Sequence, residues 1–334
     1  MRIRSARHAV VAVVVALAVA ACETPSQPGG TPAGTASAIP GAKGTGNAPV
    51  TVELGTAGTP YNPTWLDDAL YFGVEPKNDN DKHQLWRWRE GHAERVPLKL
   101  PADCYGSLLR PVRRPGGALA VVAGCYENGV LRFRVLAVDR STGATEQLFR
   151  SGRAPGYVTW SGDTAFASVV TGGCAAVTRL RADALEAIDA GPTFAGRPWP
   201  SSGWAAGGAT TCPGGERVVF PTTLDRTDSV AALATGDAGA TAAWTLFLAP
   251  AGLTGAAKEV AGGFVDQAGV AATPDGSRFV VAATRQSAAG LWLVDAAGGT
   301  VHAIAPGAHS GAAIAPDGGR AASVQGGRMV VYPV

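Results

Sequence analysis

From residue 50 onward, short apolar segments alternate with tight turns, and the same arrangement recurs along the chain. The clearest copies are ATPDGSRFVVAA at 272–283 and AIAPDGGRAASV at 313–324. In each turn, proline fixes φ at the first corner, the aspartate side chain can accept backbone N–H groups, and glycine tolerates the positive φ that closes the turn. Each copy therefore predicts two antiparallel strands joined by a hairpin turn.

Looser copies of this hairpin lie upstream. Residues 63–74 and 158–169 share Thr-Trp, a turn with aspartate and an apolar strand, whereas 110–124 and 210–220 carry Pro-Gly-Gly at the turn. The second strand of each copy is predicted to begin near Ala69, Ala118, Ala165, Arg217, Arg278 and Arg320. A candidate third strand, apolar or alternating, follows in every copy, at 83–90, 131–140, 175–182, 243–250, 290–297 and 328–334.

Repeats of roughly 40–50 residues are typical of four-stranded propeller blades. The six copies therefore predict an all-β fold over residues 50–334, a six-bladed β-propeller of four-stranded antiparallel blades. The last copy ends at Val334 after three strands, which would leave an open sheet edge. Residues 48–55, APVTVELG, alternate as a strand, and we expect this N-terminal strand to close the ring as the outer strand of the last blade.

The Pro-Asp-Gly hairpin followed by LWLVD (residues 291–295) resembles the TolB-type propeller repeats of bacterial envelope proteins. The resemblance covers residues 50–334, and the fifth and sixth copies carry Pro-Asp-Gly in full. It implies the propeller fold for the whole of this segment.

The first residues, MRIRSARHAVVAVVVALAVAAC, place three arginines before an apolar stretch at 9–21 that is too short to span a bilayer. Residues 19–22, Val-Ala-Ala-Cys, resemble the lipobox of bacterial lipoproteins. The resemblance implies that residues 1–21 are a signal peptide, and that Cys22 is acylated and becomes the mature N-terminus. The alternatives are an ordinary signal peptide or an anchor in which the cysteine occurs by chance.

Residues 22–49 are rich in Pro, Gly, Ser, Thr and Ala, and we interpret them as a flexible tether between lipid and propeller. The whole chain has 28 basic and 26 acidic residues, and removing the three arginines of the signal leaves 25 basic against 26 acidic residues, which is nearly neutral. No basic stripe remains to indicate nucleic-acid binding. We expect a monomer attached through acylated Cys22 to the bilayer, on the extracytoplasmic face of the cell membrane or envelope.

Besides Cys22, four cysteines lie in the mature chain, an even number that predicts disulfides in an exported chain. Cys104 precedes the first strand of the second blade and Cys125 ends its second strand, so both lie at the same rim and are predicted to pair. Cys174 and Cys212 would pair by elimination, although they are placed towards opposite rims. A zinc site is the alternative, but no CxxC spacing supports it.

The candidate metal ligands do not show the spacing of a known metal-binding motif. His83, His92, His302 and His309 lack HxH or HxxxH spacing, and NDNDKH (residues 78–83) lacks the glycine and distal glutamate of a calcium loop. We expect neither a bound metal nor another cofactor, although a ring of blades could still bring distant ligands together.

The tryptophans fall into two groups. Trp65 and Trp160 occupy matching repeat positions, and Trp86 and Trp88 alternate on one strand, so all four are predicted to pack between blades. Trp199 and Trp204 lie in the connection RPWPSSGW, where they either pack within a loop or form an exposed surface for a partner.

Two classes of function remain. A nucleophile elbow, Gly-x-Ser-x-Gly, occurs nowhere in the chain. We therefore expect a non-enzymatic scaffold that binds an envelope protein, peptide or glycan. The alternative is a propeller enzyme of the lactonase or polysaccharide lyase type, with a divalent metal in the central channel.

Overall fold

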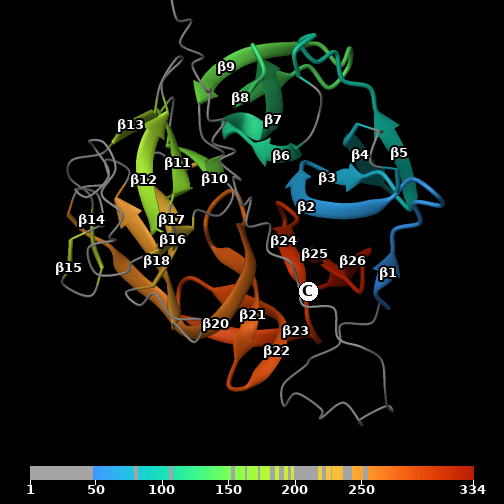
Figure 1. The fold of residues 1–334 in the computed structure, drawn as a ribbon. Helices are drawn as coiled ribbons and strands as arrows, with labels where there is room; N and C mark the ends of the chain where they lie inside the picture. The colour runs from blue at the N-terminus through green and yellow to red at the C-terminus, as the bar shows by residue number, and fades with distance from the viewer. Residues whose placement is uncertain are drawn as a thin grey trace, which may run out of the picture. The chain divides into compact units, whose positions relative to one another are not determined.

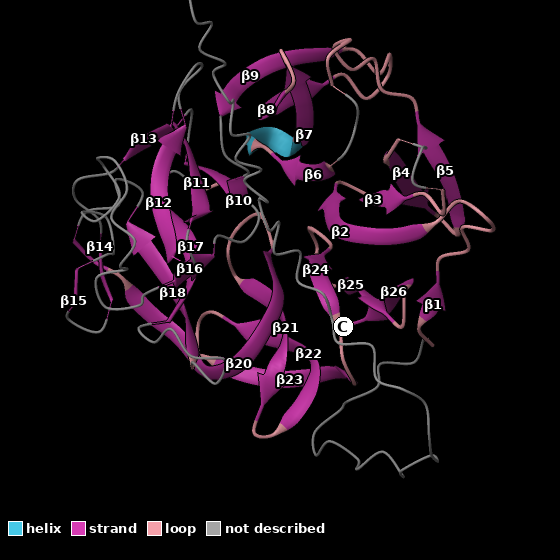
Figure 2. Ribbon diagram, viewed as in Figure 1, coloured by secondary structure: helices cyan, strands magenta, loops and turns pink. Residues whose placement is uncertain are grey.

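The computed structural model describes residues 48–78, 82–104, 108–151, 155–161, 164–171, 174–180, 185–187, 192–194, 197–198, 217–219, 223–226, 228–235, 243–250 and 255–334. All of them belong to one compact unit of the chain, residues 39–334. They form β-sheets and one short 3-10 turn, η1 (Pro115–Gly117), which Figure 2 shows in cyan. None of these segments is a helix with the length and hydrophobicity needed to cross a bilayer.

Three antiparallel sheets of four strands each follow one another along the chain, with their strands in sequence order. The first contains β2 (Thr59–Leu66), β3 (Ala69–Glu75), β4 (Gln84–Arg89) and β5 (His92–Val96). The second contains β6 (Leu109–Arg113), β7 (Leu119–Glu127), β8 (Val130–Val138) and β9 (Thr145–Ser151). The third contains β10 (Pro155–Ser161), β11 (Thr164–Thr171), β12 (Cys174–Leu180) and β13 (Leu185–Ala187).

A seven-stranded sheet follows. Its strands are β16 (Arg217–Val219), β17 (Ser229–Thr235), β18 (Trp244–Pro250), β20 (Lys258–Ala272), β21 (Arg278–Arg285), β22 (Ala288–Asp295) and β23 (Thr300–Pro306). The long strand β20 pairs with β18 through its first half and with β21 through its second half, with a register shift between Val265 and Gly269. One continuous strand thus joins two groups of strands, and Gly263 and Asp266 adopt positive φ within it.

A small three-stranded sheet was not expected from the sequence. It contains β15 (Arg197–Pro198), β14 (Pro192–Phe194) and β19 (Gly255–Ala256). Strands β14 and β19 pair in parallel, so two segments about sixty residues apart in the chain lie side by side.

The last sheet takes strands from both ends of the chain. It contains β24 (Ser310–Ile314), β25 (Arg320–Gln325), β26 (Arg328–Pro333) and β1 (Val50–Thr51). In β1, Val50 pairs with Val331 and Thr51 with Val330, and the Val52 N–H donates to the Met329 carbonyl at 2.9 Å. The expectation that an N-terminal strand supplies the outer strand of the last sheet is confirmed.

Figure 1 shows the sheets of this unit around a common centre, with β2, β6, β10 and β24 closest to it. Strand β2 contacts both β6 and β24, β6 contacts β10, and β20 contacts β24. The first sheet therefore packs against the last, which confirms the predicted all-β propeller. The number of six blades stays a prediction, because β20 joins two groups of strands into one sheet.

Clusters of buried apolar side chains fill the spaces between neighbouring sheets. The second strands β3, β7 and β21 are almost continuously apolar and buried, because a neighbouring sheet covers each of their faces. The outer strands β5 and β23 carry exposed residues instead. The core is therefore divided into layers between sheets, and the sequence repeats because each layer needs the same strand pattern.

The Pro-Asp-Gly turns have the predicted chemistry. The Asp275 carboxylate accepts the Ser277 N–H at 3.0 Å, and the Asp317 carboxylate accepts the Gly319 N–H at 2.9 Å. Gly276 and Gly318 have φ of 68° and 72°, in the left-handed region that favours glycine.

The predicted starts of the second strands can be compared with the structure. Strands β3, β21 and β25 begin at Ala69, Arg278 and Arg320, as predicted, and β7 and β11 begin one residue away from the predicted positions.

The prediction that a second strand begins at Arg217 is wrong. Arg217 begins β16, the first described strand of its group, and β17, beginning at Ser229, lies between β16 and the predicted third strand, β18. The Pro-Gly-Gly at 213–215 has the composition of a hairpin turn, but the strand after it, β16, is not the one that pairs with the predicted third strand. A turn-like composition therefore predicts that the chain turns, but it does not specify which two strands the turn connects.

A buried arginine links several sheets. At the end of β6, Arg113 donates to the Thr223 carbonyl at 2.7 Å and forms an ion pair with Asp225. The Thr223 hydroxyl donates back to the Arg113 carbonyl at 2.8 Å and accepts the Trp160 N–H at 3.2 Å. The Asp225 N–H donates to the Pro274 carbonyl at 2.6 Å. Segment 223–226 therefore connects β6, β10 and the turn before β21.

We expect the substitution Arg113→Met to lower the free energy of unfolding by about 2 kcal/mol, because it leaves the buried Thr223 carbonyl without a donor. The Asp225 side chain is 40% exposed, so solvent screens its ion pair with Arg113, and losing this ion pair adds little to the loss of stability. Urea unfolding measures the effect. The matched control is Arg226→Met, which removes an ion pair with Asp228 that is exposed on both sides and should cost less than about 0.5 kcal/mol. Equal losses for the two variants would contradict the structural role of Arg113.

Candidate binding site at the connecting rim

In each of the first two sheets, the second strand turns into the third at the end where the chain crosses between sheets. We call this end the connecting rim, and in these sheets its described residues are 76–78, 82–83, 97–104 and 128–129. It lies opposite the hairpin turns that carry Pro-Asp-Gly, since successive strands are antiparallel.

A disulfide joins Cys104 and Cys125 at this rim. Cys104 lies in residues 97–104, which lead from the first sheet to the second and which we call the crossing segment. Cys125 lies near the end of β7, and both cysteines are buried. The predicted pairing is confirmed. The side chain of Cys174 and the whole of Cys212 lie outside the described residues, so their pairing stays a prediction.

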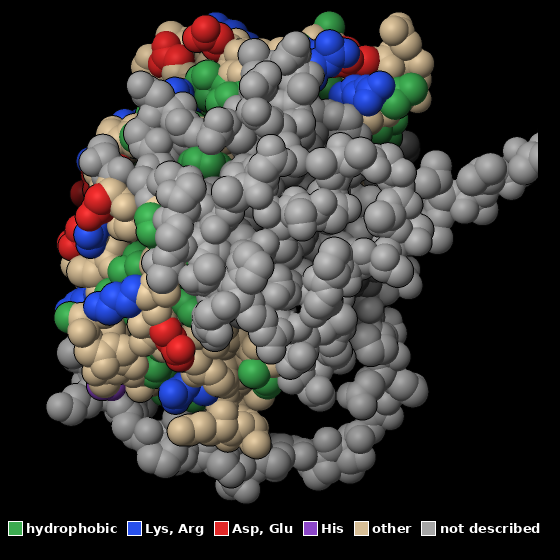
Figure 3. Space-filling model, turned by 90° about the vertical axis from the view of Figure 1, so that its left-hand side faces the viewer, with side chains coloured by type: hydrophobic (Ala, Val, Ile, Leu, Met, Phe, Trp, Pro, Cys, Tyr) green, Lys and Arg blue, Asp and Glu red, His purple; other side chains and the backbone are tan. Residues whose placement is uncertain are grey.

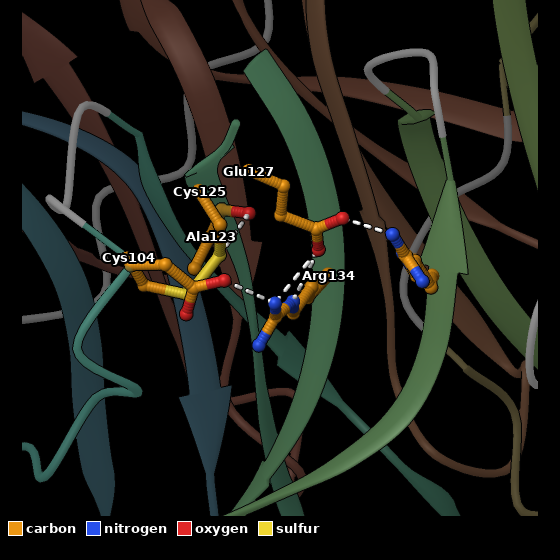
Figure 4. A network of polar contacts seen from close by, with 7 residues as sticks. Cys104, Ala123, Cys125, Glu127 and Arg134 are labelled. Carbon is orange, nitrogen blue, oxygen red and sulfur yellow. Dashed lines mark hydrogen bonds and ion pairs between the residues drawn. A yellow bond between two sulfur atoms is a disulfide. The ribbon is translucent and has the colours of Figure 1, made fainter. Parts of the chain in front are cut away.

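A network of charges holds the same segment in place (Figure 4). The Arg134 guanidinium on β8 donates to Glu127 at 2.7 Å and pairs with Asp103, the residue before the disulfide. Glu127 also pairs with Arg150 on β9. The hydrogen bond from Arg134 lowers the pKa of Glu127, so the carboxylate stays ionised. The crossing segment is therefore fixed to the second sheet both covalently and electrostatically.

A cavity of about 200 Å³ lies beside the disulfide, between the first sheet and the crossing segment. Its apolar walls come from two sides. The first sheet contributes Leu85 and Val96, and the facing side contributes Leu98, Leu100, Cys104 and Leu109. Lys82, His83, Gln84 and Arg95 supply polar lining. Among the lining residues that the structure describes, none is an aspartate or a glutamate.

The imidazole of His83 is oriented by a chain of hydrogen bonds. The Leu109 N–H donates to the Tyr61 hydroxyl oxygen at 3.1 Å, and that oxygen lies 2.7 Å from His83 Nδ1. If the tyrosine proton is directed at Nδ1, every group in this chain is satisfied and the neutral imidazole carries its proton on Nε2.

The electrostatics of this chain agree with that assignment. Burial raises the pKa of Tyr61 to about 12, so the phenol keeps its proton. Burial lowers the pKa of His83, partly offset by the negative charge of Glu75. The imidazole is therefore neutral at pH 7.

The ring of Tyr61 reaches this position because Gly73 lies beneath it. A Cβ at Gly73 would lie 2.3 Å from the Tyr61 ring and 2.6 Å from the Leu109 carbonyl oxygen. Any larger residue at this position on β3 would displace the tyrosine that orients His83.

The other histidines do not gather around a common point. His309 Nε2 lies 3.3 Å from the Pro306 carbonyl, and His302 lies 3.8 Å from Asp295. No three His, Cys, Asp or Glu side chains in the described part of the chain are placed to share a metal ion. Asp79 and Asp81 of the candidate calcium loop lie outside that part.

The predicted core tryptophans lie between sheets. Trp65 and Trp88 pack edge to face, with ring centroids 6.3 Å apart, in the cluster between the first and last sheets, and Trp86 packs against it. Trp160 is buried between the second and third sheets. These predictions are confirmed. Trp199 and Trp204, the predicted partner-binding aromatics, and Cys22, the predicted lipidation site, lie outside the described residues.

The described surface combines both charge signs with a few exposed apolar side chains. Figure 3 shows acidic and basic side chains close together on one face. The large hydrophobic side chains with substantial exposure in the described chain are Val50, Tyr126 and Val130. Tyr126 and Val130 both belong to the hairpin of β7 and β8 at the connecting rim, so this rim presents apolar surface to solvent.

Sequence reasoning missed the residues that build this site. Tyr61, His83 and Leu109 come from different strands and loops, and only the histidine was considered, as a metal ligand. The one available signal was Gly73, an isolated glycine within an apolar strand, which marks a close approach of another group.

No protein-family profile matches the sequence, and no curated protein matches it either. Among solved structures, TolB from Acinetobacter baumannii superposes with a TM-score of 0.50 at 13% identity, over 81% of this chain and 63% of that one. This chain thus spans less than two thirds of the TolB chain. A gluconolactonase from Xanthomonas campestris gives a TM-score of 0.50 at 14% identity, over 85% of this chain and 89% of that one.

An oligogalacturonate lyase in complex with manganese is similar as well, with a TM-score of 0.48 at 12% identity, over 83% of this chain and 77% of that one. At 13% and 14% identity, the likeness to TolB and to the gluconolactonase transfers the fold without the activity. What the comparisons establish for this chain is the β-propeller fold.

Proposed function

We propose that this chain is a lipoprotein anchored through acylated Cys22 on the extracytoplasmic side of a membrane. Residues 22–49 serve as its tether, and its propeller, residues 50–334, binds a protein, peptide or glycan without catalysing a reaction. In this proposal the connecting rim of the first two sheets, with its cavity and exposed hairpin, is the recognition surface.

The observation that carries the proposal is that described polar side chains on the inner strands and beside them form hydrogen bonds between strands and sheets. Thr64 on β2 donates to the Pro111 carbonyl of β6 at 2.9 Å, and Arg113 bonds to segment 223–226. Ser323 donates to the Gly311 carbonyl of β24 at 2.7 Å. These groups hold sheets and strands together, as the frame of a binding scaffold requires. Within the described residues, a cavity with polar lining lies at the rim.

The buried disulfide supports an extracytoplasmic location, because such bonds persist in oxidising compartments and are rare in the cytosol. A lasting anchor needs more than one acyl chain, and bacterial-type lipidation at Cys22 would supply it.

The anchor can be tested with the variant Cys22→Ser. We expect it to lose incorporation of a labelled fatty acid and to leave the membrane fraction, because no thiol remains for acylation. Cys212→Ser removes a cysteine outside the lipobox and should keep both properties. A Cys22→Ser chain that remains acylated would contradict the proposal.

The location can be tested by trapping free thiols in intact cells. We expect Cys104 and Cys125 to be protected from an alkylating reagent in the full chain and to react when residues 1–21 are deleted, because the reducing cytosol prevents the bond. Mass spectrometry of the peptides reads the result. Equal protection of both chains would contradict export.

The recognition surface can be tested with a photo-activated cross-linking residue at Val130, which is 50% exposed at the connecting rim. We expect a discrete adduct in cell envelopes, and none with the same group at His302, which is exposed on the outer strand β23. The rival enzyme function predicts turnover of a lactone or an acidic polysaccharide by the purified chain. Turnover without any adduct at Val130 would overturn the binding role.

A further inference from the structure

His309 lies where the chain passes from β23 into the last sheet. Residues 306–311, which we call the last connection, read Pro-Gly-Ala-His-Ser-Gly and lead from β23 to β24. The Gly307 N–H donates to the Ala289 carbonyl of β22 at 2.9 Å, which fixes the connection to the strands that precede it. Strand β24 packs against β2 and β20. A movement of the last connection would therefore move the start of an inner strand.

The imidazole of His309 is buried, and one of its nitrogens has no partner. The residue is 7% exposed, and its ring packs edge to face on Tyr332 with the ring centroids 5.7 Å apart. Nε2 lies 3.3 Å from the Pro306 carbonyl oxygen, whereas the buried Nδ1 has no hydrogen-bond partner among the described residues. Because a carbonyl can only accept, the neutral ring carries its proton on Nε2 and a lone pair on Nδ1.

The polar groups next to this ring are already bonded to one another. The Gln325 side-chain N–H donates to the Pro306 carbonyl at 2.9 Å, and the Tyr332 hydroxyl donates to the Gln325 Oε1 at 2.9 Å. A second proton on the His309 ring, at Nδ1, would therefore be a buried positive charge without an acceptor. Burying such a charge is strongly unfavourable.

The ionisable groups around the ring do not offset this cost. Burial raises the pKa of Tyr332 to about 12, so its hydroxyl stays neutral. The other ionisable side chains that face the space between β20–β23 and the last sheet are Asp266, Arg278, Asp295, His302 and Arg328. Burial lowers the pKa of His309, the hydrogen bond to the Pro306 carbonyl opposes this, and no charged side chain of the described chain contributes.

We infer that His309 makes the last connection an acid-sensitive switch. At neutral pH the ring is uncharged and packs on Tyr332, and the connection is closed. At acidic pH the protonated ring is hydrated only when it leaves this site, so the open form becomes more populated. Gly307 and Gly311, with φ of 99° and 67°, flank the histidine and can absorb the change in backbone direction. The inference does not depend on the proposed binding function.

The direction of the pH dependence follows from the lowered pKa. In the open form the imidazole has its ordinary pKa of 6.5, and in the closed form its pKa is lower. The open form therefore binds more protons, and the closed form loses stability as the pH falls below 6.5. At higher pH the ring is neutral in both forms, and the equilibrium between them no longer depends on this group.

The test is amide hydrogen exchange of the purified full chain in detergent at about pH 7 and about pH 5, read at single amides by mass spectrometry. After correction for the intrinsic exchange rate, we expect the protection of the Gly307 amide to fall by about tenfold at the lower pH. The Thr273 amide, which donates to the Arg278 carbonyl at the opposite end of the strands, should change by less than about twofold. Equal protection of the Gly307 amide at the two pH values would overturn the inference.

Matched variants assign the effect to one residue. His309→Phe keeps an aromatic ring against Tyr332 but cannot be protonated, so the protection of the Gly307 amide should become independent of pH to within about twofold. His302→Phe removes an exposed histidine of β23 and should keep the full change. His309→Gln is also uncharged and takes the place of His309→Phe where that variant does not fold. A pH dependence that survives in a folded His309 variant, or disappears in His302→Phe, would overturn the assignment.

Nuclear magnetic resonance of the histidine rings in the unaltered chain needs no variant. We expect the ring that contacts Tyr332 to be the Nε2–H tautomer and to titrate with a pKa below 6.5. A pKa at or above 6.5, or a proton on Nδ1 of the neutral ring, would overturn the inference whether or not the variants fold.

Discussion

The last sheet takes its outer strand from the other end of the chain, and the position of the first sheet depends on this pairing. Strand β1 supplies hydrogen-bond partners to β26, whose edge would otherwise be open to pairing with another chain. Trp65 and Trp88 of the first sheet share one buried cluster with Met329 and Val331 of the last, and the Arg320 guanidinium lies 4.9 Å from the centre of the Trp65 ring. The first sheet also bears β4 and β5, which line the cavity, so closure of the ring supports the candidate site.

Local chemistry explains which parts of the fold could be predicted from the sequence. Strands after a Pro-Asp-Gly turn begin at Arg278 and Arg320 as expected, because proline, aspartate and glycine specify the corner within four residues. The Cys104–Cys125 bond followed from antiparallel order, which placed both cysteines at one rim. The prediction at Arg217 failed because Pro-Gly-Gly is equally compatible with a connection between sheets.

The site itself depends on contacts that the sequence does not encode locally. Leu109 and Tyr61 are 48 positions apart, and Arg113 and Thr223 are 110 apart. Their hydrogen bonds exist only once neighbouring sheets are packed, so neither periodicity nor turn composition could identify them. Gly73 was visible as an exception within an apolar strand, but the group that approaches it could not be named from the sequence.

The same packing is the reason that we place the proposed recognition surface at the rim of this propeller. Near the centre, Thr64 and Arg113 complete hydrogen bonds between inner strands and segment 223–226, so a ligand that took these groups would also loosen the contacts between sheets. At the connecting rim, the disulfide and the Arg134 network hold the backbone without using the Nε2–H of His83. A ligand there can therefore be bound by groups that the fold does not need, and binding can change in evolution without loss of the ring.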